Sequence, residues 1–260
     1  MTNPGSISEE TQYDIIIVGG GVYGAVIARA CASHGYSTAL IEKNEFCDST
    51  SAHSLNVLHG GLRYLQHLNI KRMRRSIYSR RYFQQISPDN IEYLPFLTPL
   101  DSWGLNSPLI MRSALLLNDL ISIDRNSGMS KQQHLKGGSV ISRKSLLKKL
   151  PEFSKQPVSG AAIWYEAVMN NVKQLVTDVL DAAVENGADI ASNTEAIQLL
   201  HRDGKLTGLS CRDKQGNNID LRGRIVIDTS GRTSVKLGSS LPGYQAIRQH
   251  WARAVNMLID

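Results

Sequence analysis

The apolar residues near the start of the chain follow two kinds of pattern. Residues 13–18 (YDIIIV) form a nearly continuous apolar run rich in β-branched side chains, which is typical of a strand buried on both faces of a parallel sheet. Residues 25–34 then place small and apolar side chains at helical spacing up to Gly35, and residues 37–41 (STALI) form a second apolar run. Strand, helix and strand in this order predict an α/β fold with a parallel sheet.

Two longer helical patterns and a group of strands follow. Residues 66–87 place apolar side chains among cations at helical spacing and are closed by Pro88. Residues 172–186 repeat apolar side chains more regularly and stop at Gly187, so they are predicted to form a helix that packs on the sheet. Three strands are predicted after this helix, at residues 189–191 continuing past Thr194, at 206–212 and at 219–228.

Composition narrows the class of protein. The chain has 260 residues, of which 42% are hydrophobic and 20% charged, and this is the profile of an ordinary globular protein. No apolar run approaches the roughly 18 residues that a spanning helix needs. The N-terminal residues lack the basic start of a secretory signal, and the three cysteines have no paired spacing. A cytoplasmic protein without a disulfide framework or a zinc site is therefore expected.

The net charge of +6 is concentrated in one segment. Residues 71–81 (KRMRRSIYSRR) carry six cations and no acid, so the rest of the chain is neutral overall. Such local charge differs from the general basic footprint of a nucleic-acid-binding protein, and nothing resembles a base-reading module. Two interpretations stay open for this segment, a solvated helix face and a basic surface attracted to anionic lipid.

A glycine-rich turn follows the first predicted strand. Gly19, Gly21 and Gly24 fit G-x-G-x-x-G, in which the first glycine permits a tight turn, the second lets the backbone approach a pyrophosphate and the third lets the helix lie close to the strand. Glu42 ends the next strand 18 residues after Gly24, near the spacing of about 20 at which an acid accepts ribose hydroxyls. An acid favours an unphosphorylated ribose, although Lys43 beside it weakens that preference. The pattern predicts dinucleotide binding, and the alternative is a glycine turn with no ligand.

The residues after Glu42 do not continue as the regular strand–helix unit of a nicotinamide dehydrogenase. A polar loop at residues 44–56 is dense in hydroxyls, among them Ser49, Thr50, Ser51 and Ser54. It leads into VLHGGLRYL, which contains the adjacent glycines Gly60 and Gly61 and three side chains able to bind an anion or move a proton, His59, Arg63 and Tyr64. Hydroxyls and glycines suit a backbone that lies against a large flat cofactor.

These stretches resemble a known family. DIIIVGGGVYGAVIARACASHGYSTALIEKNEF and TSAHSLNVLHGGLRYLQ are similar to the N-terminal part of the FAD-dependent glycerol-3-phosphate dehydrogenases, within the wider D-amino-acid-oxidase-like flavoproteins. HGGLRYL is the most specific piece, and a thinner likeness runs through LPFLTPL, LLLNDLISI, LLKKLPEF and GAAIWYEA to RIVIDTSG. The resemblance covers most of residues 13–231, strongly before residue 70.

The resemblance implies a Rossmann-like FAD-binding domain built from discontinuous segments, with part of an α+β substrate domain. The implied segments are a first FAD-binding segment at 13–92, a substrate-facing insertion at 93–165, a return segment at 166–233 and the start of a truncated substrate domain at 234–260. In this family the residue at Ala196 meets the adenine, and Gly231 belongs to a second glycine turn under the dinucleotide. The cofactor-binding residues expected on this basis are Gly19, Gly21, Gly24, Glu42, Lys43, Thr50, Ser51, Ser54, Gly60, Gly61, Ala196 and Gly231.

The implied activity is oxidation of glycerol 3-phosphate or a similar small anionic substrate, with hydride transfer from a C2 alcohol to flavin N5. His59, Arg63 and Tyr64 match residues that line the family's substrate site. Arg63 would hold the phosphate by paired hydrogen bonds, and His59 would orient or move the hydroxyl proton. The alternative for His59 is a packed histidine that donates to a carbonyl. Family members often sit on the membrane and pass electrons to quinone, so a quinone or another acceptor, and peripheral membrane contact through residues 71–81, are further expectations.

The chain departs from the family pattern at several positions. Leu55 and Asn56 stand where a serine and a lysine usually precede HGG. Glu166 stands where an aspartate is usual, and NNVK at residues 170–173 replaces Asp-Asp-Ala-Arg. These changes leave the substrate open among glycerol 3-phosphate, other 2-hydroxy acids and amino acids or amines. An NAD-dependent dehydrogenase and a non-catalytic nucleotide-binding or membrane-surface module stay open as alternatives. Against the family the chain is short, so an N-terminal fragment is expected.

Overall fold

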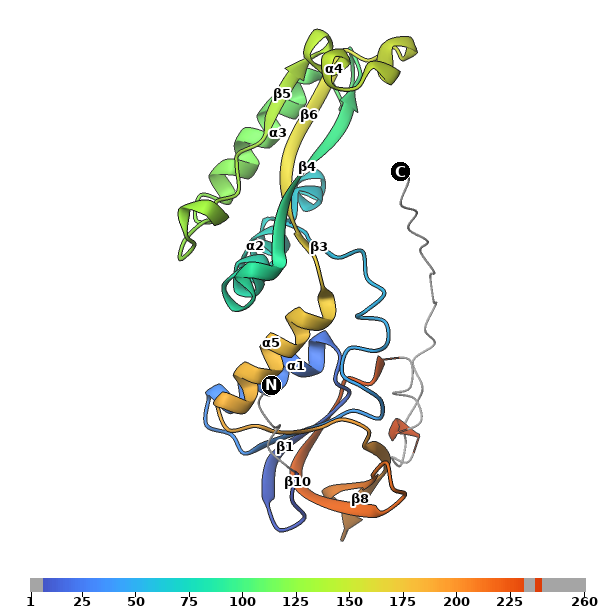
Figure 1. Ribbon diagram of the computed structural model, residues 1–260. Coiled ribbons are helices and arrows are strands. Elements are labelled where there is room, and N and C mark those ends of the chain that lie inside the picture. Colours follow the sequence, from blue (N-terminus) through green and yellow to red (C-terminus); the bar gives the residue numbers. More distant parts are fainter. Residues whose placement is uncertain (1–6, 232–236, 240–260) are drawn as a thin grey trace. The chain divides into compact units, whose positions relative to one another are not determined.

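The chain divides into two compact units. In the computed structural model, the described residues up to 55 and from 172 onward form the first unit, and residues 56–171 form the second. The structure describes residues 7–231 and 237–239, and Figure 1 shows the elements of both units. The predicted start of a further domain at 234–260 therefore lies outside the described residues, apart from residues 237–239.

A six-stranded sheet forms the centre of the first unit. Its strands lie in the order β7 (Asp189–Ala191), β2 (Thr38–Ile41), β1 (Gln12–Val18), β10 (Asn218–Asp228), β9 (Lys205–Arg212) and β8 (Glu195–Arg202). The first four of these are parallel, and β9 and β8 continue the sheet in antiparallel fashion. Ile16, Ile17 and Leu40 are completely buried, so the predicted strands at 13–18 and 37–41 are confirmed as the centre of a parallel sheet.

Two helices of the first unit, α1 (Val22–Ser33) and α5 (Val172–Glu185), lie side by side against this sheet (Figure 1). Ala25 and Ala28 of α1 have no exposed surface, which allows the helix to approach the strands closely. Gly35 follows the end of α1 with a φ of +81°, the left-handed conformation that the sequence predicts at this helix end. Both predicted helices are therefore confirmed within one or two residues of most of their ends.

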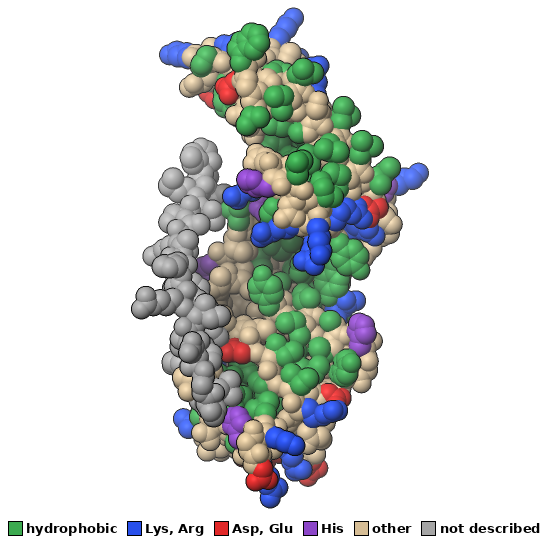
Figure 2. Space-filling view, turned by 180° about the vertical axis from the view of Figure 1, so that it is seen from behind, with side chains coloured by type: hydrophobic (Ala, Val, Ile, Leu, Met, Phe, Trp, Pro, Cys, Tyr) green, Lys and Arg blue, Asp and Glu red, His purple; other side chains and the backbone are tan. Residues whose placement is uncertain are grey.

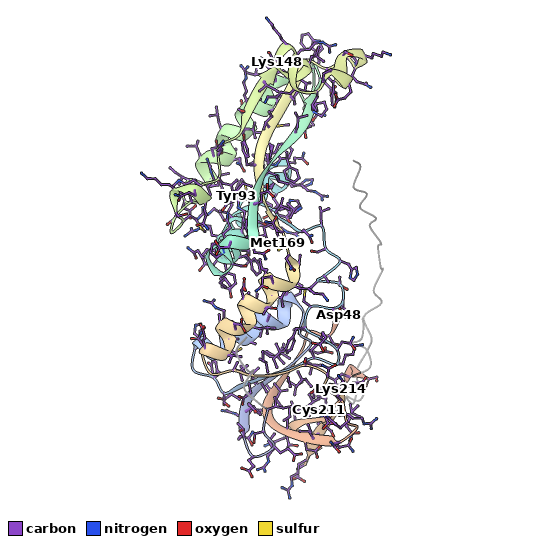
Figure 3. The ribbon with its side chains drawn as sticks, viewed as in Figure 1. Asp48, Tyr93, Lys148, Met169, Cys211 and Lys214 are labelled. Carbon is purple, nitrogen blue, oxygen red and sulfur yellow. The ribbon has the colours of Figure 1, made fainter. Side chains whose placement is uncertain are left out.

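The three cysteines of the chain all belong to the first unit and are all free. Cys47 and Cys211 are buried, and Cys31 is half-buried. Burial raises the pKa of the Cys211 thiol to about 12. Figure 3 labels Cys211, which lies in β9. The second unit contains no cysteine in its sequence.

The chain after β7 corrects one prediction. A single strand was expected to run from residue 189 past Thr194, but β7 ends at Ala191 and β8 begins at Glu195, at the other end of the strand order. Asn193 has a φ of +53°, which interrupts the extended conformation. The amides of Asn193 and Thr194 donate to the carbonyl oxygens of Asn44 and Glu42, at 3.0 and 2.8 Å, instead of continuing the ladder of β7. The first unit therefore has four strands after α5, where three were predicted.

The second unit is an antiparallel sheet with helices. β3 (Val57–Leu58), β4 (Ile91–Leu100) and β5 (Ser139–Ser142) all pair with the long central strand β6 (Gly160–Met169). The α-helices are α2 (Ile70–Ile86), α3 (Pro108–Ile121) and α4 (Arg143–Lys149). Short 3-10 helices are η1 (Leu62–His67), η2 (Pro88–Asn90), η3 (Lys131–Gln133) and η4 (Pro151–Lys155). The predicted helix at 66–87 is thus α2, preceded by a separate 3-10 turn.

The boundaries of the second unit differ from the predicted segments. The sequence places divisions at 92/93 and 165/166, whereas the structure places them at 55/56 and 171/172. Residues 57 and 58 join the second unit because they pair with residues 168 and 167 of β6. Residues 166–169 stay in it because β6 continues unbroken to Met169. The HGGLRYL stretch therefore belongs to the second unit, although the resemblance assigned it to the FAD-binding segment.

Candidate functional site

The turn between β1 and α1 requires glycine at two positions. Gly19 has a φ of +109°, and a Cβ there would lie 2.7 Å from the backbone of Thr229. A Cβ on Gly24 would lie 1.8 Å from the carbonyl oxygen of Gly19, so α1 could no longer rest against the end of β1. A Cβ on Gly21 would meet Ser51, with Oγ at 3.0 Å. These distances account for the tight turn and the close helix that the sequence predicts.

A groove of about 350 Å³ lies beside this turn in the first unit. Its walls are the glycine turn, the end of β2, the hydroxyl loop, the start of β8 and the turn after β10. The sequence-predicted cofactor residues that line it are Gly19, Gly21, Glu42, Lys43, Thr50, Ser51, Ala196 and Gly231. Gly24 lies beneath the turn, and Ser54 is not among the lining residues. Most of the predicted residues of this unit, from distant parts of the sequence, therefore meet at one groove.

Glu42 connects the end of β2 to the glycine turn. Its Oε2 accepts a hydrogen bond from Gly20 N at 2.7 Å, and its Oε1 accepts one from Asn44 N at 3.0 Å. A carboxylate offers about four lone-pair sites, so two acceptor positions remain after these bonds. Glu42 is half-buried and lines the groove. Its carboxylate is thus held in place by the backbone and still able to accept hydroxyl groups of a ligand.

The hydroxyl loop is fastened to the glycine turn and to α5. Ser51 Oγ accepts a hydrogen bond from Val22 N, in the first turn of α1, at 3.1 Å. Cys47 N donates to Gly20 O at 3.0 Å, and Lys173 Nζ lies 2.9 Å from Asp48 Oδ1 (Figure 3 labels Asp48). No acidic residue occupies the first turn of α1. A ligand anion in the groove would therefore meet the positive end of this helix with a serine hydroxyl beside it.

The turn after β10 closes the groove from the other side. Thr229 Oγ1 donates to Val18 O at 2.9 Å or to Gly19 O at 3.0 Å, and Thr229 N donates to Val18 O at 2.8 Å. Gly231 follows with a φ of +66°. Sequence reasoning named Gly231 here but gave no role to Thr229, which fixes the two turns to each other. A hydroxyl directly after a strand that pairs with β1 was the available signal.

The candidate substrate residues lie in the second unit and do not line one cavity. His59 is exposed and lines a cavity of about 720 Å³, which neither Arg63 nor Tyr64 lines. Arg63 is exposed, and among the residues that the structure describes it has no hydrogen-bonding or acidic partner. Tyr64 is half-buried, with the guanidinium carbon of Arg72 at 4.7 Å from its ring centroid. The structure of this unit therefore does not gather the three side chains around a single ligand position.

The two glycines of HGGLRYL pack against α2. Gly60 N donates to Glu166 Oε2 at 2.7 Å, and a Cβ on Gly60 would lie 2.2 Å from Arg80 Nη1. Gly61 has a φ of +86°, and a Cβ on it would lie 3.1 Å from the Met73 backbone. Both residues thus have a packing reason to be glycine within this unit. Their predicted contact with a cofactor remains a prediction.

A buried ion pair, Arg80 with Glu166, was missed by sequence reasoning. Each residue is only 4% exposed, and Arg80 Nη1 lies 3.3 Å from Glu166 Oε2. Burial lowers the pKa of Arg80 and the Glu166 carboxylate raises it, and an arginine stays charged in either case. Met73, Ile77 and Arg80 are spaced at i, i+4 and i+7 and share the buried face of α2. That spacing was the signal that Arg80 differs from the solvated cations of its segment.

The other cations of residues 71–81 divide into those that have an acidic partner and those that have none among the described residues. Arg74 and Arg81 both pair with Asp124, with Arg74 Nη2–Oδ2 at 2.9 Å and Arg81 Nη1–Oδ2 at 2.8 Å. The hydrogen bond from Arg74 is the main reason that the pKa of Asp124 falls to about 2. Lys71, Arg72, Arg74 and Arg75 are exposed, as the interpretation of a solvated helix face expects, whereas Arg80 is buried and Arg81 is half-buried. Lys and Arg side chains gather on the second unit in the view of Figure 2.

Within residues 7–231 and 237–239, no group of three or more His, Cys, Asp or Glu side chains could hold a metal ion. Over the same described part of the chain, no helix has the length and apolar character needed to cross a membrane.

Comparison with known proteins gives a family and several relatives. The profile of the DAO family, described as FAD dependent oxidoreductase, matches residues 14–253. The chain is 30% identical over 257 residues to an alpha-glycerophosphate oxidase of Streptococcus pneumoniae, covering 97% of this chain and 41% of the relative. It is 28% identical over 222 residues to a glycerol-3-phosphate dehydrogenase of Mycobacterium leprae, covering 85% of this chain and 36% of the relative. The chain thus spans about two fifths of the length of these relatives.

Solved structures show the same fold at lower sequence identity. A glycerol-3-phosphate dehydrogenase from Bacillus halodurans, complexed with FAD, superposes with a TM-score of 0.63 at 19% identity, over 89% of this chain and 37% of the other. An L-alpha-glycerophosphate oxidase from Mycoplasma pneumoniae with FAD bound gives a TM-score of 0.60 at 17% identity, over 88% of this chain and 57% of the other. These likenesses establish the fold.

Proposed function

Because the chain belongs to the DAO family of FAD-dependent oxidoreductases, we propose that the groove of its first unit binds the ADP half of FAD and that the whole protein oxidises glycerol 3-phosphate or a similar small anion. FAD is the cofactor of this family, and the predicted fold class is confirmed. The single observation that carries the cofactor proposal is the meeting of the predicted residues along one groove.

The groove has the chemistry that an ADP moiety requires. Glu42 keeps two acceptor positions for the ribose hydroxyls while Gly20 N and Asn44 N hold its carboxylate. Gly21 leaves room for a pyrophosphate beside the first turn of α1, whose amides favour an anion. Ser51 lies at the same place and its hydroxyl can donate to a phosphate oxygen, because it only accepts from Val22 N in this structure. Ala196 lines the groove and can offer its backbone to the adenine.

The substrate proposal rests on the relatives and on the second unit. The relatives are named alpha-glycerophosphate oxidase and glycerol-3-phosphate dehydrogenase, and FAD in such enzymes supplies an acceptor for two electrons. Arg63 is exposed and lacks an acidic partner in the described chain, so its guanidinium is available to hold a phosphate by two hydrogen bonds. His59 is proposed to orient or accept the hydroxyl proton, and Tyr64, next to Arg63 in the sequence, is proposed as a further binding group.

The partners of the whole protein are proposed more broadly. Oxidase and dehydrogenase relatives both need an electron acceptor, and a quinone or another acceptor is proposed for this protein. Peripheral membrane contact through residues 71–81 is retained only for Lys71, Arg72 and Arg75, because the other three cations of that segment have acidic partners. Oxidation of 2-hydroxy acids or amino acids is the alternative to glycerol 3-phosphate, and a non-catalytic nucleotide-binding module is the alternative to an enzyme.

Titration with FAD tests the groove. The purified chain should quench flavin fluorescence saturably, and Glu42→Gln should weaken binding about tenfold, which corresponds to about 1.4 kcal/mol. The reason is that the glutamine side chain has an NH₂ group in place of one carboxylate oxygen. This NH₂ group only donates hydrogen bonds, so the side chain can no longer accept bonds from both the backbone amides and the ribose hydroxyls. Glu185→Gln removes the same charge from the exposed end of α5 and should leave FAD affinity unchanged.

Two results would count against the cofactor proposal. Equal weakening by Glu42→Gln and Glu185→Gln would show that net charge matters and that the Glu42 position does not. Binding of NAD without binding of FAD would assign the groove to a nicotinamide cofactor. The substrate is identified separately, by loss of the visible absorbance of bound flavin on addition of glycerol 3-phosphate, 2-hydroxy acids or amino acids. If none of them reduces the flavin, a non-catalytic module is the better description of the chain.

A further inference from the structure

The cavity of about 720 Å³ in the second unit is strongly cationic. It lies along one side of α2, next to β3 and His59, and no acidic residue lines it. Its cationic lining residues are Lys71, Arg72, Arg75 and Arg80, with the hydroxyls of Ser76 and Ser79 among them. The volume falls within the roughly 300–1,000 Å³ typical of small-molecule sites. This cavity belongs entirely to the second unit, and the proposed FAD groove to the first.

Three of these cations have no acidic side chain paired with them among the described residues. Arg74, Arg81 and Arg80 of the same helix have acidic partners, whereas Lys71, Arg72 and Arg75 have none among the described residues. Lys71 and Arg75 are four positions apart and Arg72 and Arg75 are three apart, so the charges are neighbours on one helix face. Like charges at these spacings repel each other and destabilise a helix. The helix thus keeps a repulsive cluster directed at the cavity, and an anion bound there would relieve the repulsion.

Arg80 supplies a second and independent indication of a ligand. This side chain is 96% buried, since its exposed fraction is 4%, and it lines the cavity. Its Nε has no hydrogen-bond partner in the described structure, although Nη1 pairs with Glu166. A buried guanidinium with an unpaired N–H is costly unless something accepts from it. The N-terminal end of α2 adds to the positive electrostatic potential of the cavity, because no acidic residue lies in the first turn of this helix.

We propose that this cavity binds a phosphoryl group, as inorganic phosphate or as a phosphate monoester. Arg72 and Arg75 provide planar forks that match phosphate oxygens, and Lys71 provides a third charge. The ring of Tyr64 lies against Arg72 and holds that guanidinium in a defined direction. Two serine hydroxyls add donors, so the set exceeds what the two oxygens of a carboxylate can accept but suits a dianion with three terminal oxygens. Binding here is independent of flavin, so its test is distinct from that of the proposed function.

Calorimetric titration with inorganic phosphate and then with glycerol 3-phosphate tests the site. Both should bind, glycerol should not, and added salt should weaken binding because the cations are partly exposed. Arg72→Ala/Arg75→Ala should lower phosphate affinity at least tenfold. The matched control Arg112→Ala/Lys144→Ala removes two exposed charges of the same unit outside the cavity and should change affinity less than about twofold.

A second variant keeps the test valid if the double variant folds poorly. Ser79→Glu places a carboxylate in the cavity four residues after Arg75, where it should pair with that side chain and block phosphate binding without loss of folding. Failure of the wild-type chain to bind phosphate or glycerol 3-phosphate at about 10 mM would overturn the proposal. Equal losses in the Arg72→Ala/Arg75→Ala and Arg112→Ala/Lys144→Ala variants, or phosphate binding retained by Ser79→Glu, would also overturn it.

The source of the phosphoryl group is decided with vesicles. One outcome is that phosphatidylglycerol vesicles capture the wild-type protein and phosphatidylcholine vesicles do not. If this capture is lost in Arg72→Ala/Arg75→Ala and is competed by glycerol 3-phosphate, a lipid headgroup is identified as a ligand of this cavity. Binding of soluble phosphate esters without capture by either vesicle would identify a free ester. Capture by anionic vesicles that Arg72→Ala/Arg75→Ala retains would contradict a phosphoryl site at these residues.

Discussion

Each unit fixes a glycine-rich loop by the same hydrogen bond, and the two surroundings differ. Glu42 accepts from Gly20 N in the first unit and Glu166 accepts from Gly60 N in the second, both at 2.7 Å through Oε2. Glu42 is half-buried, lines a groove and is not paired with a cation in the described structure. Glu166 is 4% exposed and pairs with Arg80. One carboxylate is therefore open to a ligand, and the other is enclosed as part of the structure.

The difference teaches how to interpret paired glycines. In the first unit the space beside Gly21 is bounded only by a serine hydroxyl, so a small residue leaves room for a ligand. In the second unit the space beside Gly60 is already occupied by the guanidinium of Arg80. The same residue type thus leaves open space in one loop, where a cofactor is proposed to bind, and allows internal packing in the other. Two pairs of substitutions test this distinction.

The largest expected effect is on the buried ion pair. Arg80→Met should lower the free energy of unfolding by about 3–5 kcal/mol, because it leaves the Glu166 carboxylate buried without a cation. Glu42→Gln should cost less than about 1 kcal/mol, because its site is open to water. Urea denaturation of both variants measures the contrast. Arg80→Met/Glu166→Gln should be more stable than Arg80→Met alone, and a double variant that is less stable would show that the pair is not the cause.

Substitution of the two glycines should have an intermediate effect. Gly60→Ala should cost about 1–3 kcal/mol, because its Cβ would lie 2.2 Å from Arg80 Nη1. Gly21→Ala should cost less than about 1 kcal/mol, because Ser51 Oγ at 3.0 Å can move aside, but it should reduce FAD binding. Thermal unfolding and FAD titration separate the two outcomes. If Gly60→Ala costs as much in an Arg80→Met background as in the wild type, the guanidinium is not the obstacle.

The smallest effect concerns the partly exposed ion pairs that Arg74 and Arg81 form with Asp124 in the second unit. The hydrogen bond from Arg74 lowers the pKa of Asp124 from 3.8 to about 2 in the folded state. A lowered carboxyl pKa adds stability above about pH 4, and this stability is lost as the pH falls through 2. Asp124→Asn should therefore cost at most about 1 kcal/mol at pH 7, after screening by solvent, and progressively less as the pH falls toward 2, where the carboxyl group of the folded state is half protonated. Urea unfolding between pH 7 and 2 should show this convergence, and a constant difference would contradict it.

The features of the first unit that depend on local sequence were predictable. The strand at 13–18, the glycine turn and Glu42 follow one another along the chain, and backbone geometry alone forces them together. The break at Asn193 was not predictable in the same way, because a left-handed residue and two hydrogen bonds to residues 42 and 44 interrupt an otherwise strand-like run. The alternation of apolar and polar residues predicts that a strand exists, but the end of this strand depends on hydrogen bonds to a loop that is distant in the sequence.

The second unit was less predictable because its charges are paired over long distances. Arg80 and Glu166 are 86 positions apart, and Arg74 and Asp124 are 50 apart. A count of cations along residues 71–81 cannot show which of them meet an acid. The family resemblance correctly indicated the fold and the cofactor class. HGGLRYL lies in the second compact unit, directly after the short strand β3, and its assignment to the FAD-binding segment stays a prediction.

The two units differ in whether a thiol reagent can report their unfolding, because all three cysteines lie in the first unit. Cys47 and Cys211 are buried in the first unit, and the raised pKa of Cys211 keeps its thiol protonated and unreactive while that unit is folded. The second unit has no thiol. Labelling of Cys47 and Cys211 by a thiol-specific reagent, counted apart from the half-buried Cys31, therefore measures how often the first unit opens, and opening of the second unit adds no thiol of its own to that signal. The native cysteines thus act as a chemical probe of local unfolding in the unit that is proposed to hold FAD.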